Sequence, residues 1–143
     1  PSGADGQRPS ALAASPMNEL QLRLIGLRGA TTCEANDVTS IETAVSDLID
    51  VLVNRNHLDP SRIVSLTFSV TADLDACFPA AVARRREGWD AVALLDTQQM
   101  AVRGALPRCI RLLAHAWIPG EQVPFHPYLK GAQQLRPDRL SHN

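Results

Sequence analysis

The chain has 143 residues, of which 45% are hydrophobic and 20% charged, a composition typical of one globular domain and unlike disordered or collagen-like proteins. Its 14 lysines and arginines nearly balance 15 aspartates and glutamates, so no overall basic field attracts nucleic acid or an anionic membrane. The odd cysteine count, without a Cys-x-x-Cys motif or metal-ligand spacing, predicts no metal site and a reducing, cytoplasmic compartment.

The first 19 residues are rich in Pro, Gly, Ser and Ala and lack the apolar stretch of a secretory signal. We expect an N-terminal tail over 1–19 that is either disordered or foreign to the native protein, a single domain over 20–138 and a C-terminal tail over 139–143. No apolar run approaches the roughly 18 residues that a membrane span needs, so a soluble protein without a membrane partner is predicted.

The first elements in chain order are a strand and a helix. Leu20 to Leu27 alternates apolar and polar residues, and the change of phase at Gly26 predicts a strand that ends in a bend. Over 36–56, apolar residues recur every three or four positions, which indicates an amphipathic helix capped by Asp37 or Thr39.

A second strand is predicted from Ile63 to Val70, where apolar and polar residues alternate again. A strand, a helix and a strand of these lengths indicate a right-handed parallel crossover. Pro79 is suited to the first turn of a short helix whose end Gly88 marks, and the apolar run from Ala91 to Leu95 predicts a third strand.

The C-terminal third predicts two more strands. Cys109 to Trp117 is apolar except for Arg111 and His115, and Tyr128 to Leu135 is a weaker fifth candidate. The elements together favour an α+β domain with a mixed β-sheet and helices on one face. The other face of such a sheet needs a cover, for which oligomerisation is the simplest source.

Two arginines are the strongest candidates for anion binding. Arg28 lies among the glycines of Gly26 to Thr32, a segment without the spacing of a nucleotide-binding loop, and is either an exposed turn residue or a ligand for a carboxylate. Arg111 sits inside an apolar strand. It therefore either closes a buried salt bridge, with Asp96 the most obvious partner, or faces a cleft that receives an anion.

Other charged residues favour structural roles. The run 84–86 is basic but lacks interleaved aromatic residues, and it fits a solvated helix end better than a nucleic-acid surface. His57 and His115 have no partner in catalytic register, and Asp73 and Asp75 form only a weak acid/base signal in a loop.

Six strings between residues 22 and 138 occur in an order that carries a family resemblance: RLIGLRGATT, TADLDACFPAAVAR, Gly88-Trp89, Cys109-Ile110-Arg111, HPYL and LRPD. In this order the chain resembles the chorismate mutases of the AroH type. The resemblance implies the Bacillus chorismate mutase-like fold, a homotrimer that forms a central pseudo-barrel, and active sites between subunits.

The resemblance also implies an isomerase of aromatic amino acid biosynthesis in the shikimate pathway. The expected reaction is the Claisen rearrangement of chorismate to prephenate, without cofactor, metal or covalent intermediate. A dianionic substrate held in a chair-like conformation while charge builds on its ether oxygen needs positioning and a fixed cation, and the arginines supply both.

Site residues follow from the resemblance. The implied catalytic residues are Arg28, Arg111, Asp96, Gln99 and Tyr128. Arg28 and Tyr128 bind substrate carboxylates, and Arg111 donates to the ether oxygen. The implied substrate-binding residues, some contributed by an adjacent subunit, are Phe78, Ala80, Arg84, Leu94, Leu95, Thr97, Gln98, Leu135 and Arg136.

Three positions depart from the family pattern. Asp96 and Gln99 stand where the family commonly has cysteine and glutamate, and Ala81 replaces a lysine. We hypothesise that the catalytic carboxylate has moved to Asp96, with Gln99 accepting a hydrogen bond through its amide oxygen. The alternative to this relocation is that Asp96 only pairs with a nearby arginine and the site is impaired. Rival functions are a mutase for a chorismate analogue and a non-catalytic trimeric protein that binds a small dicarboxylate.

Overall fold

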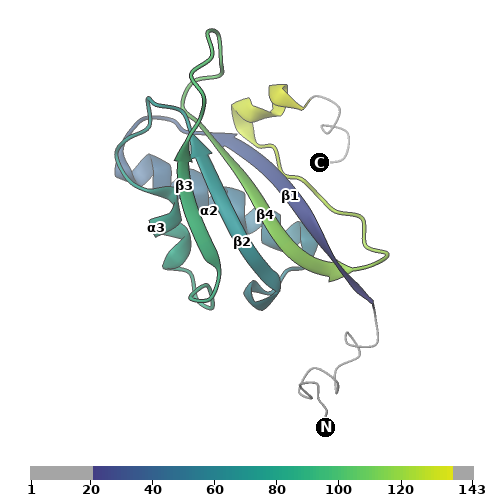
Figure 1. The fold of residues 1–143 in the computed structure, drawn as a ribbon. Helices are drawn as coiled ribbons and strands as arrows, with labels where there is room; N and C mark the ends of the chain where they lie inside the picture. Colours follow the sequence, from purple (N-terminus) through teal and green to yellow (C-terminus); the bar gives the residue numbers. More distant parts are fainter. Residues whose placement is uncertain (1–20, 137–143) are drawn as a thin grey trace.

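A computed structural model describes residues 21–136, so the predicted tails over 1–19 and 139–143 lie outside the described residues. Four strands form one sheet with the order β1-β4-β2-β3 (Figure 1). The elements are β1 (Leu22–Thr32), α2 (Val38–Asn56), η2 (Pro60–Arg62), β2 (Ile63–Val70), α3 (Pro79–Arg84), β3 (Ala93–Gln98), β4 (Cys109–Pro119) and η3 (Lys130–Leu135). No helix within the described range is long and apolar enough to cross a membrane.

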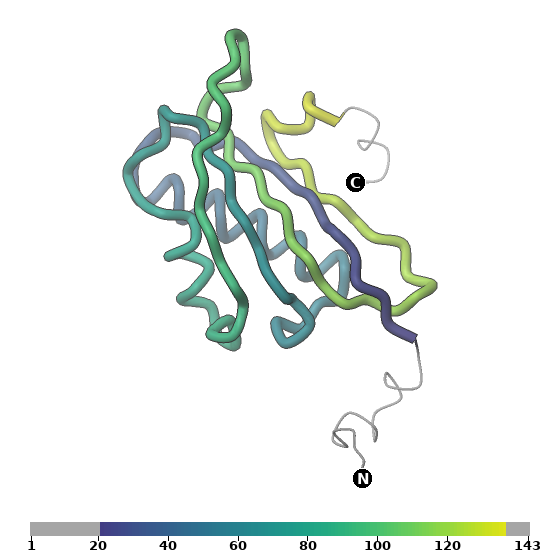
Figure 2. The backbone as a smooth tube through the Cα atoms, in the orientation of Figure 1, coloured from purple at the N-terminus to yellow at the C-terminus, as the bar shows by residue number. Residues whose placement is uncertain are grey.

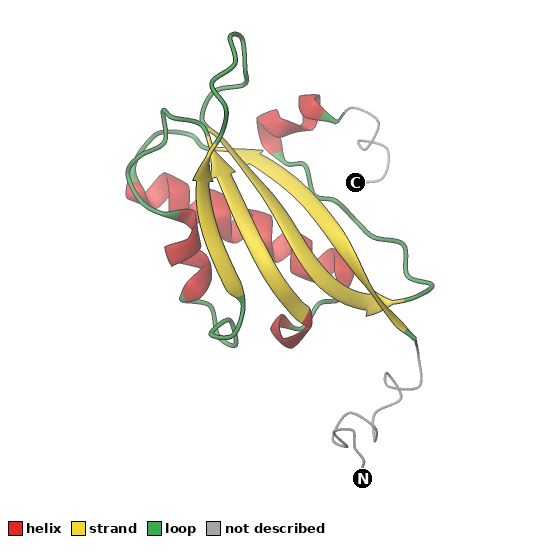
Figure 3. Cartoon of the chain, in the orientation of Figure 1, coloured by secondary structure: helices red, strands yellow, loops and turns green. Residues whose placement is uncertain are grey.

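The sheet is mixed, as predicted. β4 runs antiparallel to both β1 and β2, whereas β3 is parallel to β2. β1 and β2 therefore point the same way with β4 between them, and the parallel crossover through α2 is confirmed. Helices α2 and α3 cover one face of the sheet, whereas no described helix covers the other face (Figures 1 and 3).

Local sequence explains both covering helices. Asp37 caps α2 by accepting a hydrogen bond from the Ser40 amide at 2.7 Å, and the buried stripe begins at Ile41 and includes Leu48. Pro79 opens α3 as predicted. That helix ends at Arg84, however, and Gly88 lies beyond it in a left-handed conformation with φ 85°.

Two predicted strand boundaries and one predicted strand are wrong. β1 continues through Gly26, which pairs with His115 in an unbroken ladder to β4, and β3 runs on to Gln98 because that residue pairs with Val70. The predicted fifth strand is instead the 3₁₀ helix η3. Among the described residues, a single isolated bridge, Ala30 to Tyr128, precedes it.

The two faces of the sheet differ sharply in exposure. The face toward the helices buries Leu27, Leu66, Phe68 and Leu112. Along each strand, the side chains that alternate with these point the other way, and we call the face that they form the open face of the sheet. Its large apolar side chains are 42–59% exposed: Leu24, Leu95, Leu113 and Trp117. A strand presents alternate side chains to opposite faces, so one face is completed within the chain and the other is not.

The segment after β4 returns along β1 (Figure 2). Asn56 at the end of α2 holds this segment through its side chain. Its Nδ2 donates to the Phe125 backbone carbonyl at 2.8 Å, and its Oδ1 accepts from the Phe125 backbone amide at 2.8 Å. Ala30 then donates to the Pro127 carbonyl at 2.9 Å and accepts from the Leu129 amide at 2.9 Å. These bonds fix Tyr128 against the end of β1.

Candidate active site

Four of the predicted site residues gather near the ends of β1 and β4. Ala30 pairs with Arg111 across the two strands, and Tyr128 packs on Ala30 in a small cluster that Leu135 borders. The guanidinium of Arg136 lies 5.8 Å from the centre of the Tyr128 ring. The structure therefore brings Arg111, Tyr128, Leu135 and Arg136 together, although 17 positions or more separate Arg111 from the others in the sequence.

Arg28 belongs to the same region. It lies two residues before Ala30 on β1, so both side chains share the open face. Its backbone amide donates to Nδ1 of His126 at 3.0 Å. This bond ties β1 to the returning segment and leaves the guanidinium exposed for a ligand.

Two polar atoms near this region are buried without a hydrogen-bond partner. They are Nε of Arg111 and Oε1 of Gln99. A buried donor or acceptor left unpaired is costly, and such atoms in a folded protein call for an explanation such as a ligand. One is a donor with positive charge, which suits an oxygen acceptor, and the other is an acceptor, which suits a donor such as a hydroxyl.

The predicted alternative, a salt bridge between Arg111 and Asp96, is absent from the described part of the chain. Oδ1 of Asp96 instead accepts from the Ala80 amide at the start of α3, at 2.9 Å. Asp96 thus faces the helices, whereas Arg111 has the parity of the open face. The sheet itself separates the two side chains.

A second group of predicted residues lines a cavity of about 740 Å³ between β3 and the segment leading into α3. Asp96, Thr97, Gln98 and Phe78 border it, and Phe78 is 71% exposed. Burial raises the pKa of Asp96, whereas the Ala80 amide and Arg84 oppose the shift. Leu94 packs toward the core and Leu95 lies on the open face.

The predicted residues therefore form two groups that do not meet within one chain. The arginine group comprises Arg28, Arg111, Tyr128, Leu135 and Arg136, with Gln99 nearby in the chain that precedes β4. The Asp96 group comprises Phe78, Ala80, Arg84, Asp96, Thr97 and Gln98. Each group contains only part of the charge and apolar surface that a dianionic ligand requires.

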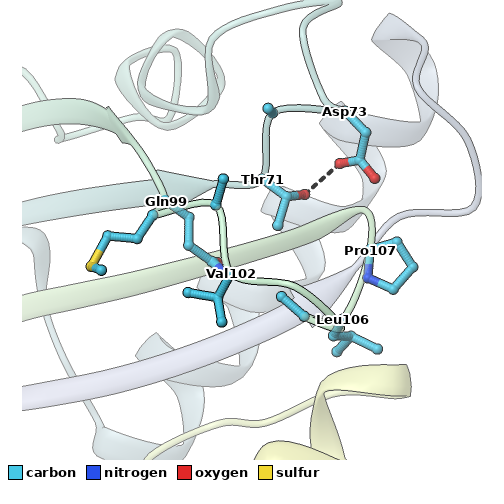
Figure 4. Close-up of a pocket in the computed structure, with 10 residues that line it drawn as sticks. Thr71, Asp73, Gln99, Val102, Leu106 and Pro107 are labelled. Carbon is cyan, nitrogen blue, oxygen red and sulfur yellow. Dashed lines mark hydrogen bonds between the residues drawn. The ribbon is translucent and has the colours of Figure 1, made fainter.

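Sequence reasoning missed a polar network beside the arginine group. A smaller cavity of about 250 Å³ lies under the loop from β3 to β4 and is lined by Thr71, Asp73, Gln99 and Leu106, among others (Figure 4). The Thr71 hydroxyl donates to Asp73 at 2.5 Å, and the Arg108 amide donates to both Asp73 oxygens at 3.0 and 3.2 Å. The short Thr-x-Asp spacing is a turn signal that predicts the bond between Thr71 and Asp73. It does not predict the bonds from Arg108.

The cysteines and the basic run that the sequence singles out have structural explanations. Cys33 and Cys109 are buried, and burial raises the pKa of both thiols, that of Cys33 to about 11, so neither is an activated nucleophile. Arg85 and Arg86 pair with Glu42 and Asp50 of α2, each at 2.8 Å. Within 21–136 no group of three potential ligands could hold a metal ion.

Comparisons with known proteins agree on one family. A family model described as chorismate mutase type I matches residues 24–139. The chorismate mutase AroH of Bacillus subtilis is 36% identical over 115 residues, covering 79% of this chain and 90% of the relative. That of Thermus thermophilus is 38% identical over 117 residues, covering 79% and 93%. A solved chorismate mutase from Clostridium thermocellum superposes with a TM-score of 0.71 at 35% identity, covering 77% and 98%.

Proposed function

The chain belongs to the chorismate mutase type I family, and from this premise we propose that it catalyses the Claisen rearrangement of chorismate to prephenate. The observation that carries the proposal is the pair of buried, unpartnered atoms, Nε of Arg111 and Oε1 of Gln99. Chorismate offers both complements, an ether oxygen that accepts and a ring hydroxyl that donates.

The chemistry asks the protein for position and charge. As the ether C–O bond breaks and a C–C bond forms within the same molecule, negative charge grows on the departing oxygen. A guanidinium already fixed at that oxygen stabilises the transition state without reorganising. Arg111 has this role. Arg28, Tyr128 and Arg136 hold the two carboxylates and keep the enolpyruvyl group folded over the ring. No proton transfer, redox step or external group is required.

We further propose that the active protein is a homotrimer whose open sheet faces meet in a central pseudo-barrel. The exposed apolar residues of the open face support this arrangement, since burying Leu95, Leu113 and Trp117 against neighbours removes the largest uncovered apolar surface of the sheet. The two separate groups of site residues support it as well, because a partner's Asp96 group can complete the arginine group.

Asp96 supplies the carboxylate on the side of the ring opposite the arginine. In the transition state the ring becomes electron-poor, which favours a nearby negative charge, and Gln99 stands neutral where the family commonly has glutamate. The Ala80 amide fixes one oxygen of Asp96 and leaves the other available to the cavity. Phe78, Thr97 and Gln98 line the same cavity, Ala80 and Arg84 of α3 lie beside it, and Leu94 and Leu95 belong to β3.

We place the enzyme in the cytoplasm, in aromatic amino acid biosynthesis. All three cysteines are free, which fits a reducing compartment. Asp96 and Gln99 in place of the cysteine and glutamate common in the family also favour a second candidate function. This is a mutase for a chorismate analogue with a different substituent at the ring hydroxyl position.

Incubation of purified protein with chorismate tests the proposal directly. Loss of the ultraviolet absorbance of chorismate, with prephenate identified by NMR, is the expected result. Turnover of a ring-substituted analogue but not of chorismate favours the second candidate. Saturable binding of chorismate without turnover overturns both and indicates a dicarboxylate-binding protein.

A further inference from the structure

Arg108, the residue immediately before β4, has a backbone conformation that needs external support. Its φ is 48°, in the left-handed region that residues other than glycine adopt at an energetic cost. Such a conformation persists when surrounding contacts determine it. Here the Arg108 amide donates to both oxygens of Asp73, its carbonyl accepts from the Cys33 amide at 2.9 Å, and its Nε donates to the Cys33 carbonyl at 3.0 Å.

Asp73 also reaches the first residue of β4 through Thr71. The Thr71 hydroxyl donates to Asp73 and its oxygen accepts from the Cys109 amide at 3.0 Å, while the Thr71 amide donates to the Cys109 carbonyl at 3.1 Å. We call the four residues Cys33, Thr71, Asp73 and Arg108 the Asp73 clasp. Together they fix the backbone of Arg108 and Cys109.

The clasp lies beside the residues that carry the unpartnered polar atoms. Arg111 follows Arg108 by three positions, and the amide of Gln99 is bonded to the carbonyl of Val70, the residue before Thr71, at 2.8 Å. The loop that joins Gln99 to Arg108 projects away from the sheet (Figures 1 and 2). Its side chains Met100 and Val102 are 80% and 58% exposed, so the loop itself contributes little packing. Arg111 is paired with Ala30 and Ser69 in the sheet, and the clasp fixes the residues from which that strand begins.

We propose that Asp73 is a positioning residue that aims Arg111 at the ether oxygen, an inference that rests on the function proposed above. A carboxylate suits this site because Oδ1 accepts from the Thr71 hydroxyl while both oxygens accept from the Arg108 amide, at 3.2 and 3.0 Å. Asparagine has one acceptor oxygen, and its NH₂ group repels the remaining donor. The Thr71 hydroxyl lowers the pKa of Asp73, so the clasp is charged throughout the neutral range.

The test compares Asp73→Asn with Asp59→Asn. Asp59 likewise accepts from a backbone amide, that of Ser61 at 2.9 Å, but it lies before β2, at the opposite end of that strand from Thr71. Asp73→Asn is expected to lower kcat by about 10- to 100-fold with a smaller change in KM, the signature of a displaced transition-state contact. Asp59→Asn is expected to leave both constants near wild type. The Asp59→Asn control makes the same chemical change at an exposed aspartate far from Arg111, so an effect of the lost charge alone appears in both variants.

A second readout separates this inference from the proposed function. The NMR resonance of the Arg111 Nε–H group, assigned with Arg111→Lys, is expected to shift in Asp73→Asn and to stay in place in Asp59→Asn, whether or not the protein acts on chorismate. An unchanged resonance, or equal kcat losses in both variants, overturns the inference. Should Asp73→Asn fail to fold, Thr71→Val removes the hydroxyl from the same clasp, and wild-type kcat in that variant also overturns it.

Discussion

The two faces of the sheet are built from the same strands but are completed by different means. On the helix-covered face, Leu27, Leu66 and Phe68 are fully buried by α2 and α3. On the open face, Leu113 and Trp117 of β4 are each 42% exposed, although their sequence neighbours are buried. The helix-covered face is therefore completed within one chain, whereas the open face leaves apolar side chains exposed, the surface on which the proposed trimer depends.

The same difference explains why the site appears in two parts. Arg28 and Arg111 share the open face, whereas Asp96 points toward the helices and is fixed by α3. No rearrangement of side chains moves a residue through a hydrogen-bonded sheet. Activity that needs both the arginine group and the Asp96 group therefore depends on contact between chains. Each prediction below alters one face of the sheet or the contact between chains.

Removal of the Arg111 guanidinium should have the largest effect. Arg111→Ala is expected to lower kcat/KM by about 10²–10³, the usual cost of losing one donor that stabilises developing charge. Arg111→Lys should also lose most activity because an ammonium cannot reproduce the guanidinium fork. Steady-state assays and circular dichroism measure both, with Arg23→Ala as a control on β1. Wild-type turnover in either Arg111 variant would return this residue to a structural role.

A charge on the open face should separate the subunits. Trp117→Lys is expected to convert the trimer to a folded monomer and to reduce activity by roughly tenfold or more at dilute concentration, since assembly follows mass action. Sedimentation velocity measures the change. Val123→Lys is the matched control, because Val123 is 83% exposed and lies outside the strands. If the wild-type protein sediments as a monomer with full activity, an active site shared between subunits is excluded.

Asp96→Asn should affect activity and stability in opposite directions. Loss of the carboxylate is expected to lower kcat about tenfold, equivalent to ~1.4 kcal/mol of barrier, whereas Gln99→Glu changes little. Burial raises the pKa of Asp96, so its stabilising contribution is present when it is protonated at low pH and is lost as pH rises through that pKa. The neutral asparagine should therefore match or exceed the thermal stability of wild type at pH 7.

The pH dependence of kcat gives the matching control for Asp96. In wild type, kcat should fall as acid protonates Asp96, beginning at a higher pH than for an ordinary aspartate, and this limb should vanish in Asp96→Asn. A silent Asp96→Asn together with a strongly activating Gln99→Glu contradicts the relocated carboxylate. That result points to a weakened mutase or to another substrate.

The smallest effect on activity is expected on the helix-covered face. Leu48 is fully buried in α2, and Leu48→Ala should lower the free energy of unfolding by about 2–5 kcal/mol. Below its melting temperature the variant should retain kcat close to wild type, because the cavity lies on the face away from Arg111. Denaturant unfolding and the chorismate assay test the two halves of this prediction. A kcat loss comparable to that of Arg111→Ala would show that the faces are coupled.

The elements that could be predicted from sequence are those whose signals are local. The limits of β2 agree with the prediction at both ends, and the stripe and capping Asp37 of α2 were legible because period and cap lie within one segment. β1 was cut short at Gly26 because only pairing with β4 shows that the strand continues. The sequence predicts a strand where the structure forms η3, although Leu129, Ala132 and Leu135 recur every third residue, as in a 3₁₀ helix.

The sequence by itself determined the chemical groups of this protein, because ordered strings of residues identify the family and Arg111 is conspicuous inside an apolar strand. Only the tertiary structure decided where those groups lie. Strand alternation and pairing place Arg111 and Asp96 on opposite faces of the sheet. Which of the two faces is covered depends on the packing of α2 and α3. The Asp73 clasp joins residues up to 75 positions apart, and hydrogen bonds over such separations leave no periodic signal in the chain.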